Sequence, residues 1–246
     1  MTDSPTHDPA PEAPKPALRR RLLLVGALAA LAAGAAGAAM TIGLGFSAAA
    51  GLKGAALVAA LLAVSAPQLE AHPFPALGAA NQLTLARAAL VGALAACIGE
   101  PAAAWGDWLA VGAVLALAGD VADGALARRT GMASDFGGAL DMELDALTVL
   151  VLGALCWQLD KAGAWILASG AMRYVFVAAS WGLPWMNAPL YDSLARKLVC
   201  GVQIGTLAVC LFTWIPAAYT APALALSLVA LTWSFGRDTL WLYRNR

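Results

Sequence analysis

Charged side chains are scarce in this chain of 246 residues: Asp, Glu, Lys and Arg make up 12% of it, against about 25% in a typical soluble domain. Fifteen basic and fifteen acidic residues leave no net charge, so the basic footprint of a nucleic-acid-binding protein is missing. Strand-like alternation of apolar and polar residues is missing too. What is present is a 61% hydrophobic chain with long runs rich in Ala, Leu, Val and Gly, which favours helices packed in a membrane.

Histidine and cysteine are also too few for several kinds of site. The two histidines, His7 and His72, do not suffice for a zinc site or a Ser-His-Asp triad. The four cysteines lie in apolar runs without a C-x-x-C pair, and we expect them to be small buried residues. They are Cys97, Cys156, Cys200 and Cys210.

The N-terminal part has three sections. Residues 1–18 are polar and rich in Pro, which predicts a disordered cytoplasmic tail. Arg19, Arg20 and Arg21 precede an apolar run from Leu22 to about Phe46, and a second run covers about 54–66. A signal peptide cleaved near AGAAGAA is an alternative, but the run is longer than a usual signal core and a polar tail precedes it. We therefore predict two transmembrane helices within residues 19–68.

Six further apolar runs have the length of membrane-spanning helices. They cover about 84–101, 106–127, 138–158, 162–184, 197–216 and 222–243. Arginines gather in alternate connections, whereas the opposite connections hold little beyond Lys53 and Lys161. Since cytoplasmic loops carry the excess of Lys and Arg, we predict an all-α, polytopic transmembrane bundle in the cell (inner) membrane, surrounded by lipid, with both termini cytoplasmic.

Residues 120–145 hold four aspartates at the edges of two apolar runs. Asp120 and Asp123 end one predicted helix, and Asp141 and Asp145 start the next. Charges at the edge of a membrane span usually face a cavity or a partner. With 3.6 residues per turn, each pair shares a face with small or basic residues. These companions are Gly124, Ala127 and Arg128 on the first helix and Gly137 on the second.

Four converging carboxylates need a compensating cation, because like charges repel in a poorly solvated place. Ligands that are all oxygen favour Mg²⁺ or Mn²⁺, and we expect two ions that bridge the carboxylates and the phosphates of a nucleotide. Arg128 offers a fork suited to phosphate oxygens. We expect Asp135, Glu143 and Arg129, by contrast, to be ordinary solvated loop residues.

The pattern D-x2-D-G-x2-A-R-x8-G-x3-D-x3-D, from Asp120 to Asp145, resembles the signature of the CDP-alcohol phosphotransferase family. The segment holding Asn81, Thr84 and Arg87 is similar to the N-x-x-T-x-x-R entry to that family's first core helix. Arg196 and Lys197, followed by Gln203, resemble a looser version of the basic segment before its fifth helix. The resemblance covers about residues 78–246, so the two N-terminal helices fall outside it.

The resemblance implies a six-helix core, a homodimer and a polar cavity open to the cytoplasm. It implies attack by an acceptor hydroxyl on the β-phosphate of a CDP-linked donor, with release of CMP. The donor is CDP-diacylglycerol or another CDP-alcohol. The metal ligands would be Asp120, Asp123, Asp141 and Asp145, and Asp145 would also be the general base. The CDP site would hold Gly124, Ala127, Arg128 and Gly137, with Asn81 and Thr84.

We predict an acceptor-binding group of Arg173, Arg196 and Lys197, which together with Arg87 could form a basic pocket beside Asp145. This pocket would suit a phosphorylated small alcohol such as glycerol 3-phosphate or an inositol phosphate. Arg196 and Lys197 could instead snorkel to lipid headgroups, and Arg173 could pair with an acid such as Asp192.

Two other function classes stay open at this point. A cation transporter would account for the acids but not for the small residues and Arg128 on the same face. A non-catalytic scaffold would not need four intact aspartates.

Overall fold

In the computed structural model, the described residues, 15–191 and 193–246, form eight α-helices and contain no strand. The helices are α1 (Lys15–Leu44), α2 (Ala49–Ser65), α3 (Ala79–Ala96), α4 (Gly106–Thr130), α5 (Asp135–Gln158), α6 (Leu167–Gly182), α7 (Leu194–Cys210) and α8 (Ala217–Arg244). Four short 3₁₀ turns lie in the connections: η1 (Ala66–Ala71), η2 (Ala103–Trp105), η3 (Ala164–Ile166) and η4 (Pro184–Asn187). The prediction of an all-α membrane bundle is confirmed.

Two predicted boundaries are wrong. Helix α1 begins at Lys15 and buries Leu18, so the end of the predicted disordered tail at residue 18 is too late. Residues 1–14 of that predicted tail lie outside the described part. The helical run continues outward because Lys, Ala, Leu and Arg are good helix formers. Helix α3 ends at Ala96 rather than near 101, where Gly99 takes a positive φ of 77° that no helix accommodates.

Four helical segments are individually long and apolar enough to cross a membrane. They are Pro16–Leu44, Ala49–Ala71, Ala103–Thr130 and Ala217–Arg244. The other four helices pack between or beside them. Four such segments in one chain are typical of an integral membrane protein.

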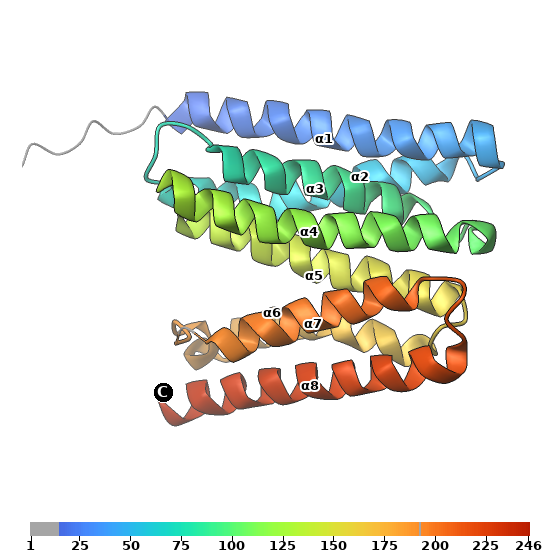
Figure 1. Ribbon diagram of the computed structural model, residues 1–246. Coiled ribbons are helices and arrows are strands. Elements are labelled where there is room, and N and C mark those ends of the chain that lie inside the picture. The colour runs from blue at the N-terminus through green and yellow to red at the C-terminus, as the bar shows by residue number, and fades with distance from the viewer. Residues whose placement is uncertain (1–14, 192) are drawn as a thin grey trace, which may run out of the picture.

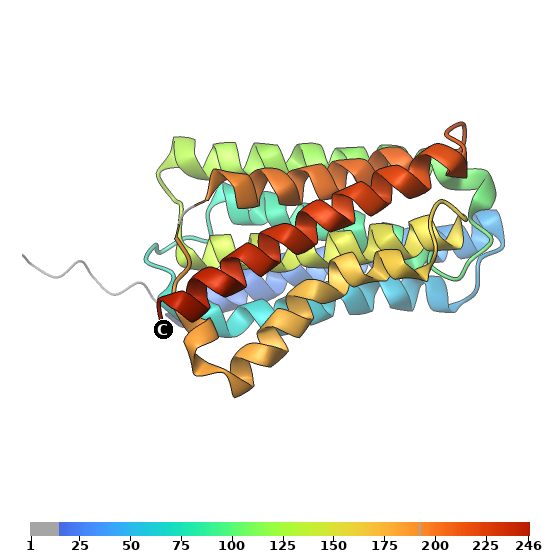
Figure 2. The same ribbon diagram turned by 90° about the horizontal axis from the view of Figure 1, so that it is seen from below.

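The helices form two groups that meet at α4, α5 and α7. Helices α1, α2 and α3 pack on one another, and α4 and α5 both pack on α3 (Figure 1). Helix α7 contacts α4 and α5. Helix α8 packs on α7 and runs obliquely across the bundle in Figure 2. The start of α1, the end of α4, the start of α5 and the end of α8 all lie at one end of the bundle. The aspartates of α4 and α5 therefore lie toward the end of the bundle where the described chain begins and ends.

Close backbone contacts join α1 to α2, and α2 to α3 in the core. A Cβ atom on Gly37 would lie 2.6 Å from the Cα of Gly51, and one on Gly54 would lie 2.7 Å from the carbonyl oxygen of Gly92 on α3. Only glycine permits such an approach, as is common where membrane helices pack closely. The two extra helices are thus an integral part of the bundle.

A polar network closes the end of the bundle away from the aspartates. Nζ of Lys53 lies 2.5 Å from Oε1 of Glu100, which also accepts a hydrogen bond from the Ser47 hydroxyl. Lys161 donates to the carbonyl oxygens of Phe212 and Ile215. The two lysines that the sequence places at this end therefore each hold two distant parts of the chain together.

Candidate active site

The four predicted aspartates converge on a single guanidinium group, that of Arg87 on α3. Nη1 lies 2.7 Å from Oδ2 of Asp123 and 2.8 Å from Oδ1 of Asp141. Nη2 lies 3.1 Å from Oδ1 of both Asp120 and Asp145. Charge-assisted contacts of this kind are the strong ones among protein hydrogen bonds, so Arg87 joins α3, α4 and α5 at the site.

Arg87 is buried because α4 leaves room for its stem. A Cβ atom on Gly119 would lie 2.8 Å from Cγ of Arg87, and Nε donates to the carbonyl oxygen of Ala116. Sequence reasoning placed Arg87 in a family-like motif and in the predicted acceptor pocket. The second placement is wrong, because the guanidinium is engaged by the four carboxylates. The available signal was its position three residues after Thr84, on the same side of the helix.

The carboxylates are not equivalent. Asp123 is the most buried, with its Oδ2 held by Arg87 and by the hydroxyl of Thr84 at 3.0 Å. Among the described residues, one oxygen each from Asp120, Asp141 and Asp145 lies within 4.8 Å of the others, close enough to hold one ion. Asp123 thus lies nearest α3, while the other three aspartates can share a cation.

The donor set fits a hard divalent cation. Four carboxylates against one guanidinium leave three formal negative charges in excess. The ligands are oxygen only, which suits Mg²⁺ or Mn²⁺ rather than zinc. The arrangement therefore meets the chemical requirement that the sequence predicts for a metal site.

A cavity of about 350 Å³ opens beside the carboxylates. All six residues that the sequence predicts for CDP binding line it: Asn81, Thr84, Gly124, Ala127, Arg128 and Gly137. Asp123, Asp141 and Lys197 line it as well. A Cβ atom added to Gly124 would meet only Nη1 of Arg128, at 3.4 Å, so this wall stays open because the side chain is absent. Four helices, α3, α4, α5 and α7, and the α4–α5 connection thus supply one recess.

The predicted acceptor-binding residues are separated from one another. Lys197 reaches the cavity, but Arg173 pairs with Glu143 and contacts the Met142 sulfur. The expectation that Glu143 is a solvated loop residue is wrong, because it lies within α5 with its side chain only 12% exposed. Asp192, the predicted alternative partner of Arg173, lies outside the described residues. Asp135 and Arg129 are exposed, as expected, but they lie within α5 and α4 rather than in a loop.

Arg196 belongs to a second polar cluster, between α7 and α8. Its Nη1 lies 3.2 Å from Oδ2 of the buried Asp238, and Nη2 of Arg237 lies 3.1 Å from Oδ1 of the same carboxylate. The Tyr191 hydroxyl donates to that carboxylate as well, at 3.3 Å. Sequence reasoning missed Asp238, which stands alone in an apolar helix, a position that usually means a cationic partner.

Gln203, one and a half turns beyond Lys197 on α7, is fully buried. Neither its amide nitrogen nor its amide oxygen has a hydrogen-bond partner in the part of the chain that the structure describes. An unpaired buried amide is destabilising by about 1–3 kcal/mol. The buried amide of Gln203 therefore lowers the stability of the fold.

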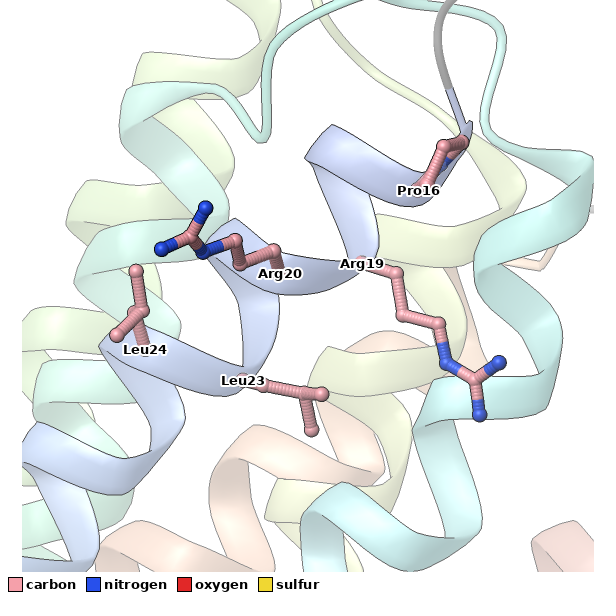
Figure 3. A pocket seen from close by; sticks show the side chains of 5 residues that line it. All are labelled: Pro16, Arg19, Arg20, Leu23 and Leu24. Carbon is pink, nitrogen blue, oxygen red and sulfur yellow. The ribbon is translucent and has the colours of Figure 1, made fainter.

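A different recess, of about 370 Å³, lies on the outer side of α1, lined by Pro16, Arg19, Arg20, Leu23 and Leu24. Figure 3 shows the two arginine side chains pointing away from each other, toward opposite sides of the helix. The described residues that line this recess include no carboxylate. They offer no metal ligand, so the aspartate cavity is the candidate active site.

Comparison with protein families agrees with the geometry. The model of the family described as CDP-alcohol phosphatidyltransferase matches residues 77–234, which contain every residue of the aspartate cluster and of the cavity beside it. The chain belongs to this family. No curated protein and no solved structure matched the chain.

Membership identifies the protein as a transferase of phospholipid synthesis that moves a phosphatidyl-type group from a CDP-alcohol. The family generally uses a divalent metal, in keeping with the three aspartates that can share an ion. The match favours a transferase over the cation transporter and the scaffold. It begins at residue 77, so the hairpin of α1 and α2 is outside it.

Proposed function

We propose that this transferase moves the phosphatidyl group of CDP-diacylglycerol to the hydroxyl of a small phosphorylated alcohol and releases CMP. The observation that carries the proposal is the cavity in which the six residues predicted to bind CDP adjoin the carboxylates. A soluble CDP-alcohol with a lipid acceptor is the alternative donor and acceptor pair.

In this proposal, Arg128 and Lys197 hold donor or acceptor phosphate oxygens, since both line the cavity and both are cationic. Gly124, Ala127 and Gly137 leave room for the nucleotide. Asp145 accepts the proton of the acceptor hydroxyl, whose oxygen forms a bond to the β-phosphorus. The bond from that phosphorus to the oxygen of the α-phosphate breaks, and the electron pair leaves with CMP.

A bound Mg²⁺ or Mn²⁺ would neutralise the phosphate oxygens and the carboxylates. Asp120, Asp141 and Asp145 would share one ion, and Asp123 would complete a pair of ions by exchanging one of its present partners. Arg87 holds Oδ1 of Asp120, Asp141 and Asp145, which leaves Oδ2 of each for other ligands.

The predicted acceptor residues divide between the cavity and two separate ion pairs. Lys197 is the predicted acceptor residue at the cavity, whereas Arg173 and Arg196 would have to exchange Glu143 and Asp238 for an acceptor phosphate. We propose that the active site and both termini lie in the cytoplasm, an orientation supported by the arginines gathered in alternate connections. We also propose a homodimer, as the family resemblance implies.

The test is a CMP-release assay in detergent or liposomes with CDP-diacylglycerol and a panel of acceptors. We expect glycerol 3-phosphate or an inositol phosphate to exceed serine, choline and free inositol. We also expect Mg²⁺ or Mn²⁺ to be required and Zn²⁺ to substitute poorly. Full activity in excess chelator would disprove the metal requirement, and a neutral alcohol as best acceptor would disprove the acceptor class.

The same panel, run on variants, tests the acceptor residues. Lys197→Met should raise the KM of a phosphorylated acceptor, and Arg173→Ala should do so only if the guanidinium leaves Glu143. Equal acceptor affinity in wild type and Arg173→Ala would remove Arg173 from the acceptor site.

A further inference from the structure

The connection between the N-terminal hairpin and the core touches both. Turn η1 contacts α1 and α2 of the hairpin and also α5 of the core. Leu69, His72 and Leu77 are buried along this connection. It therefore couples the hairpin, which lies outside the family match, to the helix that carries Asp141 and Asp145.

His72 makes two hydrogen bonds within this connection. Its Nε2 lies 3.0 Å from the carbonyl oxygen of Ala76, and its Nδ1 lies 3.0 Å from the hydroxyl oxygen of Ser134. A carbonyl can only accept, so Nε2 carries the hydrogen and donates it. In the neutral ring, Nδ1 then accepts the hydroxyl hydrogen of Ser134.

Ser134 is the N-cap of α5 and lines the cavity. Its hydroxyl oxygen accepts the backbone N–H of Gly137 at 3.1 Å, while its hydrogen is directed to His72. Gly137 in turn faces Asn81, because a Cβ atom at Gly137 would lie 2.7 Å from the Asn81 amide oxygen. The Ser134 hydroxyl thus links the His72 ring to Gly137 in the cavity wall.

Aromatic contacts hold the imidazole in this orientation. The ring of Phe74 lies 5.5 Å from that of His72 and the ring of Phe136 lies 5.6 Å from it, both edge-on. Phe136 is fully buried and is the second residue of α5. Edge-to-face packing of this kind restricts rotation of the ring and keeps Nδ1 directed at Ser134.

We propose that His72 is a positioning residue for the donor site, acting through Ser134 on the first turn of α5. The N-terminal hairpin holds the connection in the place from which His72 makes this contact. The nucleotide part of this inference rests on the proposed function.

The first test is hydrogen exchange of the Gly137 and Gly138 amides in detergent-solubilised protein. His72→Phe keeps an aromatic ring but removes the hydrogen bond, so these amides should exchange several-fold faster than in wild type. Ser134→Ala keeps His72 and its ring packing and should have the same effect, because the Gly137 N–H loses its acceptor. Unchanged exchange in a folded His72→Phe or Ser134→Ala protein overturns the proposal.

The second test uses CMP release. His72→Phe should raise the KM for the CDP donor about 5-fold, the effect of one neutral hydrogen bond, and leave kcat within about twofold. The double variant should be no worse than Ser134→Ala alone, because the two residues act through one contact. A lowered kcat with an unchanged donor KM, or fully additive effects, would overturn the assignment of His72 to the donor site.

Lys53→Met is the control for a merely structural weakening of the hairpin, since Lys53 binds Glu100 at the far end of the bundle. It should leave both the donor KM and the exchange of Gly137 unchanged, and equal changes there would overturn the specific role of His72. If wild type releases no CMP with any acceptor while exchange still responds to His72→Phe, the proposed function fails and the contact of His72 with Ser134 stands.

Discussion

Nη1 of Arg87 lies 2.7 Å from Oδ2 of Asp123, and both side chains are 4% exposed. This pair links α3 to α4 at the point where four carboxylates meet. One guanidinium keeps mutually repelling groups together, which makes Arg87 as important to the site as the aspartates themselves.

Arg87→Met should lower the free energy of unfolding by about 3–5 kcal/mol, because removing one partner leaves buried charge uncompensated. The measurement is thermal or denaturant unfolding in detergent without added metal. Arg129→Met, a change of an exposed arginine near the end of the same α4, should stay within about 0.5 kcal/mol of wild type. Equal stability of Arg87→Met and wild type would show that the carboxylates need no internal counter-charge.

Asp145→Asn should lower CMP release by about 100-fold to 10,000-fold while donor binding is kept, because an amide cannot accept the hydroxyl proton. Asp120→Asn should instead weaken donor binding, since it removes a ligand of the ion that bridges the phosphates. Calorimetric titration with the donor separates the two effects. If Asp145→Asn retains more than a few per cent of activity, the base is another group.

Gly124→Leu should block donor binding without unfolding the protein, because its side chain would project into the cavity beside Arg128. Gly236→Leu on α8 is the matched control, since nothing lies within 4 Å of a Cβ atom there and the residue is exposed. Melting temperatures of both variants show whether folding is kept. Normal CMP release by Gly124→Leu would place the nucleotide elsewhere.

The free energy of unfolding should depend on pH because folding lowers the pKa of the Glu100 carboxyl. Hydrogen bonds from Lys53, and then from Ser47, lower the pKa of this carboxyl from 4.5 to about 2. Because the folded pKa is the lower one, the stabilisation is present above pH 4.5 and is lost as pH falls from 4.5 toward 2.

The melting temperature of wild type should therefore exceed that of Glu100→Gln at pH 7, and the difference should shrink as the pH falls below 4.5. Glu70→Gln, a change at an exposed position, is the control and should behave as wild type. A difference that is the same at pH 7 and pH 3 would mean that the Glu100 charge does not contribute.

Gln203→Met should raise the free energy of unfolding by about 1–3 kcal/mol, because a buried amide without partners is replaced by an apolar side chain of similar size. Gln158→Met is the comparison expected to destabilise, since the Gln158 amide bonds the backbone of Gly99, Cys97 and Glu100. Loss of activity without a gain in stability would mean instead that the Gln203 amide binds a substrate or a water molecule.

The fold and the aspartate helices could be predicted from the residues alone because both follow from local periodicity. Eight apolar runs predicted the eight α-helices of the described residues, and spacings of three and four residues put each aspartate pair on one helix face. The same spacing rule placed Gly124, Ala127, Arg128 and Gly137 on those faces, and the cavity contains all four.

The partners of the arginines could not be predicted in this way, because they lie on different helices. Arg87 meets carboxylates 36 and 58 residues away, Arg173 meets Glu143, and Arg196 meets Asp238. Helical periodicity gives the face on which a side chain lies but not the helix that covers this face. That depends on how α3, α5 and α7 pack, and packing also brought His72 to Ser134, across 62 residues of chain.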